Sequence, residues 1–419
     1  MRQGNCLRDI LPPSPRPHAF SGINSFFTWS KVIKSSTVQE PISTSVWFHT
    51  CYPSPYRKHQ FEMMRQRFPH SEAFLYRPEL ASDQGYWVGS GKGWRIPTQI
   101  VVSRWRLPVL GQFSITLLFK LLQQPRRTVH LVTSAAKGNL WLIILTKWLF
   151  GSRCLFWSDA GFPDTISDER QIKFMRYYLP VYDGAYTAGN LGRRCCLRLG
   201  FPDEKIVNAY FSHDVDEFDE FYKARAAKER ERIRTELSLA PDTCVLLNIS
   251  RFLDWKRLED LAKSIEIAEG MPLKREIALI LIGDGNYTEH EEILGRLRNT
   301  RVIRVKSVHF PEIKSWYAVA DLFVFPSEGD IWGLVVNEAL SMRVPVICTK
   351  RIGASELVRH GWNGYLVEPR SPQQIASYIA KYVNNRELSE QMRTNAGAIV
   401  QTWNTRLGIN ALEAFLAKG

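Results

Sequence analysis

The sequence predicts an α/β protein built from two doubly wound domains. The chain has 419 residues, which is too long for one ordinary hydrophobic core. Short apolar segments alternate with helical patterns along most of it, and this order is typical of parallel sheets covered by helices. A charged run around residues 219–238, containing KARAAKERERIRTEL, separates two such series and is expected to be an exposed connecting helix.

We therefore expect five segments. Residues 1–43 are rich in Pro and Ser and are predicted to be poorly ordered. A first Rossmann-like domain follows at residues 44–218, and the connecting helix takes residues 219–238. The second Rossmann-like domain is predicted at residues 239–385, with C-terminal helices at residues 386–419.

Apolar and helical patterns predict the individual elements. Expected strands of the first domain are 45–49, 99–103, 128–133, 153–157 and 184–187, and expected helices are 60–68, 111–122, 140–150, 170–179 and 190–199. Expected strands of the second domain are 244–249, 277–282, 302–305, 322–325 and 344–348. Its expected helices are 258–268, 289–298, 313–320, one from 333, 373–383 and 388–418.

Positive charge is concentrated in the first part of the chain. The net charge is +13, and residues 44–153 hold fifteen Lys and Arg against four Asp and Glu. One interpretation is a solvated basic surface. The other is attraction to anionic lipid or to a phosphate-bearing acceptor. Nucleic acid is not expected as a partner, because no helix-turn-helix, zinc-finger or RNP-like aromatic pattern accompanies the charge.

Cysteine usage and apolar runs bear on localisation. The seven cysteines are an odd number, are scattered and form no CxxC pair, which favours reduced thiols in the cytoplasm and argues against a zinc site. The most apolar run, residues 139–150, contains Lys147 and is too short to span a bilayer. No secretory leader is expected within residues 1–43.

Residues 321–340, DLFVFPSEGDIWGLVVNEAL, carry the clearest functional pattern. A buried strand ends at Pro326, a polar turn follows, and Gly333 begins a helix. The first turn of a helix offers free N–H groups to an anion, and the carboxylates Asp330 and Glu338 flank this one. Amides beside carboxylates suggest a ligand that is part phosphate and part hydroxyl-rich, such as a nucleotide-sugar.

Two further segments at strand ends fit that ligand. SRFLDWK supplies the cations Arg251 and Lys256, which would hold a diphosphate. Gly283 and Gly285 in LIGDG would let a flat base approach the backbone. Glu338 would accept ribose hydroxyl groups. Each element alone also fits a surface cation, a simple turn or a loop residue.

The first domain contains residues that are candidates for binding an acceptor, the molecule that would receive the sugar. CYPSPYRKH, residues 51–59, follows the first strand, so Tyr56, Lys58 and His59 lie where an acceptor would be held. Solvated residues at a helix start are the alternative for each. Asp159 follows the strand LFWS, at a carboxyl end of the predicted sheet.

Taken together, these motifs resemble the GT4-type family of retaining glycosyltransferases (glycosyl transferases group 1), whose fold is GT-B. The matching segments are SRFLDWK, LIGDG, YAVADLFVFPS, DIWGLVVNEAL and GASELVRHGWNGYLVEP. The resemblance covers residues 245–383 and extends more thinly over the first domain.

The resemblance implies two domains facing across a cleft, with the acceptor on the first and the nucleotide-sugar on the second. It also implies that the C-terminal helices cross back to the first domain. Arg251 and Lys256 would neutralise the diphosphate, and the N–H groups of Gly333, Leu334 and Val335 would bind it. Glu338 would hold the ribose and Asp330 the transferred sugar. Neither a metal ion nor a cofactor is expected.

Three departures from the family pattern stand out. Asp330 is one carbon shorter than the family's Glu, with Glu328 as an alternative. CYPSPYRKH replaces the glycine-rich loop after the first strand. Asp159 stands where the family often has His, and the resemblance implies that its carboxylate would orient the acceptor hydroxyl group or act as a base.

The resemblance predicts a retaining, hexosyltransferase-type glycosyltransferase in cell-surface polysaccharide or glycolipid biosynthesis. It would be cytoplasmic or peripheral on the cytoplasmic face of the membrane. The acceptor would be a glycan or a lipid-linked molecule. The alternatives are a GT-B epimerase or phosphorylase and a noncatalytic nucleotide-sugar-binding subunit. An epimerase would release free sugar and nucleotide without an acceptor, whereas the subunit would bind donor without turnover.

Overall fold

The structure is a computed structural model. It describes residues 43–50, 55–76, 98–101, 105–107, 111–133, 137–158, 172–173, 176–177, 179–306 and 308–418. These residues belong to one compact unit. Three sequence predictions lie wholly or largely outside the described part: the order of residues 1–42, the helix at residues 170–179 and the placement of Asp159.

Seven described strands form the first sheet, and all neighbouring pairs are parallel. Their order is β3-β2-β1-β6-β7-β8-β9, so the winding direction reverses between β1 and β6. The strands are β1 (Val46–Thr50), β2 (Glu72–Leu75), β3 (Thr98–Ile100), β6 (Val129–Val132), β7 (Arg153–Ser158), β8 (Gly184–Thr187) and β9 (Ile206–Asn208). The sequence patterns did not predict β2 and β9, which are only four and three residues long.

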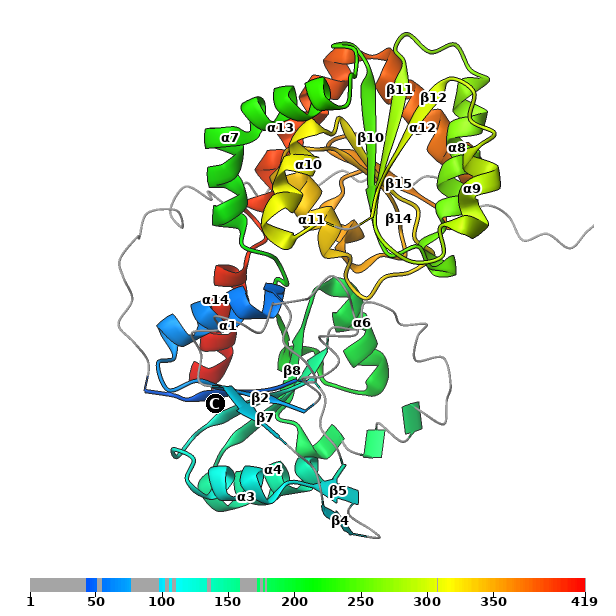
Figure 1. The fold of residues 1–419 in the computed structure, drawn as a ribbon. Coiled ribbons are helices and arrows are strands. Elements are labelled where there is room, and N and C mark those ends of the chain that lie inside the picture. Colours follow the sequence, from blue (N-terminus) through cyan, green and yellow to red (C-terminus); the bar gives the residue numbers. More distant parts are fainter. Residues whose placement is uncertain are drawn as a thin grey trace, which may run out of the picture. The chain divides into compact units, whose positions relative to one another are not determined.

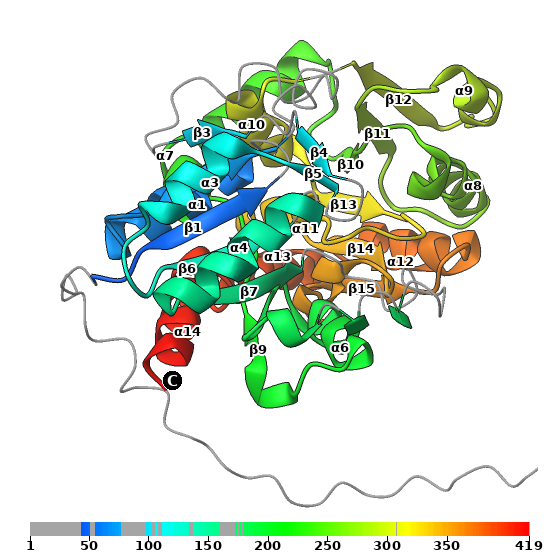
Figure 2. The same cartoon turned by 90° about the horizontal axis from the view of Figure 1, so that it is seen from below.

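Helices cover both faces of this sheet (Figures 1 and 2). Val46 and Phe48 of β1 pack in the same core cluster as α1 and the C-terminal helix, whereas Trp47 packs with α3 and α4. Successive strand residues point to opposite faces, so a strand that is apolar throughout is buried on both sides. The helices are α1 (Pro55–Arg67), α3 (Ile115–Leu122), α4 (Lys137–Phe150) and α6 (Asn190–Leu199).

The prediction of a helix from residue 111 was wrong at its start. Gly111–Phe113 is the strand β5, paired antiparallel with β4 (Trp105–Leu107). Helix α3 begins after Ser114, whose Oγ accepts a hydrogen bond from the Leu117 N–H group at 3.3 Å. Serine is a favoured N-cap and glycine is a poor helix former, so the local sequence explains this boundary.

The second domain holds a sheet of six parallel described strands in the order β12-β11-β10-β13-β14-β15. The strands are β10 (Cys244–Ile249), β11 (Ile277–Ile282), β12 (Thr300–Val305), β13 (Leu322–Phe325), β14 (Val346–Thr349) and β15 (Gly364–Val367). The helices are α7 (Val215–Glu236), α8 (Leu258–Glu269), α9 (Thr288–Leu294), α10 (Ile313–Val319), α11 (Leu334–Ser341), α12 (Pro372–Asn384) and α13 (Arg386–Val400). β15 was not predicted.

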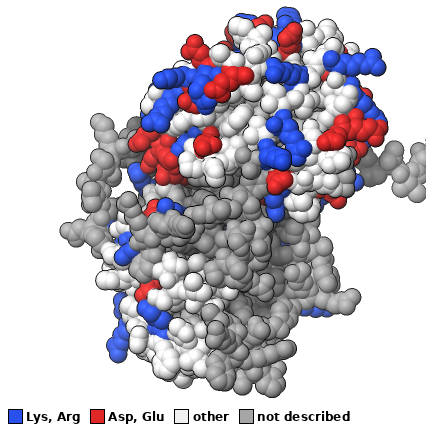
Figure 3. All heavy atoms as spheres, viewed as in Figure 1, with Lys and Arg blue, Asp and Glu red and all other residues white. Residues whose placement is uncertain are grey.

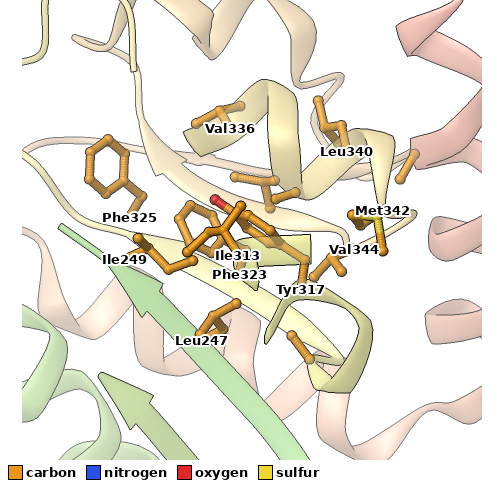
Figure 4. Close-up of a cluster of buried hydrophobic side chains, with 14 of the residues drawn as sticks. Leu247, Ile249, Ile313, Tyr317, Phe323, Phe325, Val336, Leu340, Met342 and Val344 are labelled. Carbon is orange, nitrogen blue, oxygen red and sulfur yellow. The ribbon is translucent and has the colours of Figure 1, made fainter. Parts of the chain in front are cut away.

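Apolar side chains of β10, β13, α10 and α11 form a continuous core (Figure 4). β10 and β13 are buried along their whole length, as expected of parallel strands between two helical layers. The labelled members are Leu247, Ile249, Ile313, Tyr317, Phe323, Phe325, Val336, Leu340, Met342 and Val344.

Asp321 anchors the start of β13 beside β10. Its carboxylate accepts a hydrogen bond from the backbone N–H group of Val245 at 2.8 Å and another from Arg230 of α7 at 2.6 Å. Asp321 is buried, and a buried carboxylate is tolerated only when it is paired and hydrogen-bonded. The interaction therefore joins segments 76 residues apart in the sequence.

The single C-terminal helix predicted at residues 388–418 is two helices, α13 and α14 (Thr405–Ala417). The side chain of Asn404 caps α14 by accepting a hydrogen bond from the Leu407 N–H group at 3.1 Å. Ile409 and Leu412 of α14 are buried in the core of the first sheet, and Arg67 of α1 pairs with Glu413 of α14. At Gly408, α14 packs closely against the backbone of Ala209. Only glycine fits at this position, because a Cβ would overlap the Ala209 carbonyl oxygen.

The substitution Gly408→Ala is expected to lower the free energy of unfolding by about 1–3 kcal/mol, the usual cost of overpacking a close contact. Urea denaturation measures it. Asn410→Ala on the exposed side of the same helix is the control and should stay within about 0.5 kcal/mol of wild type. Equal stability of all three proteins would show that α14 does not need this close approach.

Candidate functional site

The candidate site lies where the second sheet reverses its winding. β10 leads to β11 and β12 on one side, and β13 leads to β14 and β15 on the other. In open parallel sheets, loops diverge at such a switch point and leave a crevice beyond the carboxyl ends of the strands. The loops after β10 and β13 contain SRFLDWK and PSEGDIWG. The topology therefore brings together the two segments that the sequence analysis singled out.

Hydrogen bonds tie these two loops to each other. The carbonyl oxygen of Trp255 accepts a bond from the Glu328 N–H group at 2.7 Å and another from Ser327 Oγ at 3.1 Å. Thr349 Oγ1, at the end of β14, donates to the Ser327 carbonyl oxygen at 2.6 Å. The loops are thus held in fixed register before any ligand binds.

Lys256 and Asp330 meet at this junction. The Lys256 ammonium forms an ion pair with the Asp330 carboxylate and lies 4.9 Å from the centre of the Phe325 ring. The two side chains are only 11% and 24% exposed. In contrast, Arg251 is exposed and forms no ion pair with a described acidic side chain. The cations predicted as a pair therefore have different surroundings, with only Lys256 held in place.

Gly333 shapes the start of α11. Its φ of +85° lies in the left-handed region, and an added Cβ would come within 2.7 Å of the Ile352 side chain. Both constraints require glycine. No side chain caps the helix, so the first-turn N–H groups of Leu334 and Val335, predicted to bind phosphate, are not used by a cap.

Glu338 is buried within α11 and already has two hydrogen-bond donors. Tyr317 of α10 donates to one carboxylate oxygen at 2.7 Å, and Tyr56 of α1 donates to the other at 2.8 Å. Burial raises the pKa of Glu338 to about 7, although both hydroxyl groups act to lower it. Glu338 was predicted to accept hydrogen bonds from ribose hydroxyl groups. In this structure it accepts them from two tyrosine hydroxyl groups.

Gly285 has a structural reason to be glycine. It pairs with Phe252 in an isolated bridge, its φ is +127°, and an added Cβ would come within 2.7 Å of the Phe252 carbonyl oxygen. The loop after β11 thus packs directly on the loop after β10. Gly283 is buried at the end of β11 with a φ of +157°. Neither observation tests the prediction that a base lies against these residues.

The predicted acceptor residues lie on a helix rather than in a loop. Pro55 begins α1 because proline is well suited to the first helical position, so Tyr56, Lys58 and His59 occupy its first two turns. Tyr56 reaches Glu338 of the second domain, and His59 Nδ1 lies 2.9 Å from the Asp214 carboxylate at the start of α7. Lys58 is half-buried.

The structure also reveals contacts that the sequence analysis missed. The Arg57 guanidinium lies 3.9 Å from the centre of the Trp157 ring. Glu356, which lies in the motif GASELVRHGWNGYLVEP, accepts hydrogen bonds from the backbone and side chain of Asn190 at the start of α6. Burial raises its pKa to about 7. A spacing of 166 residues offers no sequence signal for this pair.

Comparison with known families decides the identity of the second domain. Residues 229–398 match the model of the family "Glycosyl transferases group 1". The domain belongs to this family. The match contains β10 to β15 and therefore the whole junction of Lys256, Asp330 and Gly333.

Curated relatives of this glycosyltransferase domain align over part of their length. D-inositol 3-phosphate glycosyltransferase of Thermobispora bispora is 30% identical over 194 residues, which are 44% of this chain and 44% of the relative. The capsular polysaccharide biosynthesis glycosyltransferase CapM of Staphylococcus aureus is 31% identical over 162 residues, 38% of this chain and 41% of the relative. The chain spans less than half the length of these two relatives.

Solved structures resemble nearly the whole chain. HepE of Anabaena in complex with UDP-glucose has a TM-score of 0.68 at 17% identity and covers 90% of this chain and 100% of its own. WaaG, a glycosyltransferase involved in lipopolysaccharide biosynthesis, has a TM-score of 0.61 at 14% identity, with coverage of 90% and 100%. The fold is GT-B, as the sequence predicted, and at this identity the likeness shows the fold alone.

Two further properties of the described residues concern metal ions and membranes. No group of three His, Cys, Asp or Glu side chains in that part of the chain could hold a metal ion. No described helix has both the length and the apolar character needed to cross a bilayer.

The buried Glu338 predicts a pH-dependent stability. Its pKa is 4.5 in the unfolded chain and about 7 in the folded one, so the folded state retains the proton. The stabilising contribution is full below pH 4.5 and is lost as the pH rises through about 7. Glu338→Gln should reduce this loss by up to about 3 kcal/mol, measured by urea denaturation across this range.

Glu356→Gln tests the same effect at a second, independent carboxylate. The double variant should lose both pH dependences, because each variant removes one raised pKa. If all three variants show the same pH dependence of stability as wild type, the pKa values of these two carboxylates are not raised in the folded protein.

Proposed function

We propose that this chain is a retaining glycosyltransferase that moves a hexose from a nucleotide-sugar to a glycan or lipid-linked acceptor. One observation carries the proposal. In a group 1 glycosyltransferase domain, the half-buried Lys256–Asp330 pair meets the start of α11, which no described side chain caps, at the switch point of the sheet. A cation, a carboxylate and free N–H groups together suit the diphosphate and sugar of such a donor.

Each site residue then has a role in donor binding. Lys256 and Arg251 neutralise the diphosphate, and the N–H groups of Gly333, Leu334 and Val335 bind it. Asp330 holds the transferred sugar by accepting hydrogen bonds from its hydroxyl groups. Lys256 and Asp330 are paired with each other in this structure. When the donor binds, its phosphate replaces the Asp330 carboxylate as the partner of Lys256, and its sugar hydroxyl groups replace Lys256 as the partners of Asp330. Gly283 and Gly285 border the base.

Positive charge at this position also serves the reaction. As the bond from sugar to diphosphate breaks, negative charge builds up on the leaving phosphate, and fixed cations and N–H dipoles stabilise it. We propose that Lys256, Arg251 and the α11 start do this without a metal ion or other cofactor. The acceptor attacks from the same face, which retains the anomeric configuration, and Asp159 orients its hydroxyl group.

The acceptor is proposed to bind the first domain, near Tyr56, Lys58 and His59. The basic composition of residues 44–153 favours an anionic or lipid-linked molecule. Two relatives support a part in cell-surface polysaccharide or glycolipid biosynthesis: CapM is a capsular polysaccharide biosynthesis glycosyltransferase, and TuaC of Bacillus subtilis is a putative teichuronic acid biosynthesis glycosyltransferase. A cytoplasmic location, or one at the cytoplasmic face of the membrane, follows from this proposal.

A panel of nucleotide-sugars tests the donor, with UDP-glucose first because HepE binds it. The donor should raise the melting temperature, since a ligand of the native state stabilises it. Lys256→Ala should weaken donor binding by roughly 10- to 100-fold in calorimetric titration, because a charge-assisted hydrogen bond contributes about 1.5–3 kcal/mol. The same variant should abolish sugar transfer.

Lys263→Ala is the matched control, because Lys263 forms an exposed pair with Glu259 on α8. Its donor affinity should equal that of wild type. Unchanged affinity in Lys256→Ala would reject the donor site. Donor binding without transfer to any acceptor would favour a noncatalytic subunit, and release of free sugar and nucleotide would favour an epimerase.

The Tyr56 hydroxyl is predicted to compete with the donor ribose for Glu338. Both would donate to the same carboxylate, and Tyr56 does so in this structure at 2.8 Å. Tyr56→Phe should therefore tighten donor binding by about fivefold, the effect of one hydrogen bond of about 1 kcal/mol. Calorimetric titration measures the change.

Tyr186→Phe provides the comparison, since the buried Tyr186 hydroxyl has no hydrogen-bond partner among the described residues. It should leave donor affinity unchanged. Weaker donor binding in Tyr56→Phe would instead show that Tyr56 positions Glu338 for the ribose.

A further inference from the structure

Helix α3 exposes an apolar stripe. Leu117 and Leu121 are buried on its inner side, whereas Ile115, Phe119 and Leu122 are 37%, 60% and 47% exposed. These three positions are spaced by four and three residues, so they lie on one face of the helix. The outer surface of α3 is therefore apolar where a solvated helix would be polar.

Helix α4 repeats this arrangement. Ile143 is buried, whereas Trp141, Leu145, Trp148 and Leu149 are 37%, 52%, 85% and 55% exposed. Their spacing of four, three and one also defines one helical face. Exposure of 85% is unusual for a tryptophan, which is normally well buried.

The two stripes belong to one surface. The Ser114 N–H group at the start of α3 donates to Asn139 of α4 at 2.8 Å, and both helices pack on the same side of the first sheet. Figures 1 and 2 show them side by side. We call the seven exposed residues the α3–α4 face. They are most of the twelve large apolar side chains that are exposed among the described residues.

Positively charged residues flank the α3–α4 face, two of which, Lys120 and Lys147, are paired with Glu72 and Asp183. Residues 111–153 contain six Lys and Arg and no Asp or Glu. Arg126 and Arg127 follow α3, are exposed, and pair with no acidic side chain in the described part of the chain. Arg126 and Arg127 lie near the end of α4. They shortly precede Val129 of β6, and its partner in the neighbouring parallel strand β7 is Arg153, which follows α4 closely. In Figure 3 the described surface in this region is mostly uncharged, with Lys and Arg atoms at its edge.

We infer that the α3–α4 face binds the surface of an anionic lipid bilayer. Tryptophan prefers the boundary between hydrocarbon and water, and an apolar face edged by cations is typical of interfacial binding. Anionic lipid complements Arg126 and Arg127, whereas a second copy of the chain would oppose cation to cation across a twofold axis. The inference rests on the proposed function in one respect: binding to the bilayer would bring the enzyme to a lipid-linked acceptor.

Vesicle flotation of the full chain, without donor, tests this inference. The protein should float with vesicles that contain phosphatidylglycerol, and salt should weaken the binding. Phe119→Ser/Trp148→Ser should reduce vesicle affinity at least about tenfold, because it removes two large apolar groups from the bilayer contact. Leu197→Ser on α6, where the leucine is 42% exposed, is the apolar control and should bind as wild type.

The contribution of charge has its own pair of variants. Arg126→Gln/Arg127→Asn should weaken binding about tenfold or more and reduce its salt dependence, since each cation near an anionic surface contributes roughly fivefold. Asn is chosen because Arg127 has a φ of +63°, which Asn tolerates. Arg225→Gln/Lys228→Gln on the exposed side of α7 is the control and should have little effect.

Three results would overturn the inference: no binding to anionic vesicles, wild-type binding by Phe119→Ser/Trp148→Ser, or a wild-type dimer that this variant converts to monomer. The last would identify the α3–α4 face as a protein interface. Far-ultraviolet circular dichroism confirms folding of each variant. Donor titration of the same variants separates the two proposals, because loss of vesicle binding should leave donor affinity unchanged.

Discussion

The pairing of β10 with β13 is the constraint on which the candidate site depends. These strands are distant in sequence, and the buried Asp321 carboxylate holds them together by accepting hydrogen bonds from Val245 and Arg230. Because the winding reverses between them, their loops leave the sheet edge side by side. Lys256 and Asp330 meet only for this reason. The buried Asp321 carboxylate thus helps to hold together the two strands whose loops form the candidate site.

Two carboxylates of the second domain, the buried Glu338 and the half-buried Glu356, accept hydrogen bonds from the first. Glu338 is bonded to Tyr56 of α1, and Glu356 is bonded to Asn190 of α6. Burial raises both pKa values to about 7, so each site favours a neutral acid unless donors compensate for its charge. If Glu338 holds the ribose, donor binding and the contact with Tyr56 are coupled, because they use the same carboxylate oxygens.

Much of the fold follows from local patterns. β10, β11 and β13 are apolar throughout and bounded by turn residues, and their limits were predicted to the residue. Short strands such as β2, β9 and β15 were not, because three or four residues carry too little periodicity. The start of α1 was placed too late, since Pro55 was assigned to a loop although proline favours the first turn of a helix. Lys256, Asp330 and Gly333 were named from motif spacing, which the switch point then brought together.

The sequence by itself determined the fold class, the family of the second domain and the residue types at the candidate site. These depend on short-range patterns and on motifs confined to a few residues. Only the tertiary structure decided which partners those residues have. It paired Lys256 with Asp330, gave Glu338 two tyrosine donors, and explained Gly285 by the approach of Phe252. It also turned the apolar positions of α3 and α4 outward. Apolar periodicity shows that a helix has a face, but packing alone decides whether that face meets the core or the solvent.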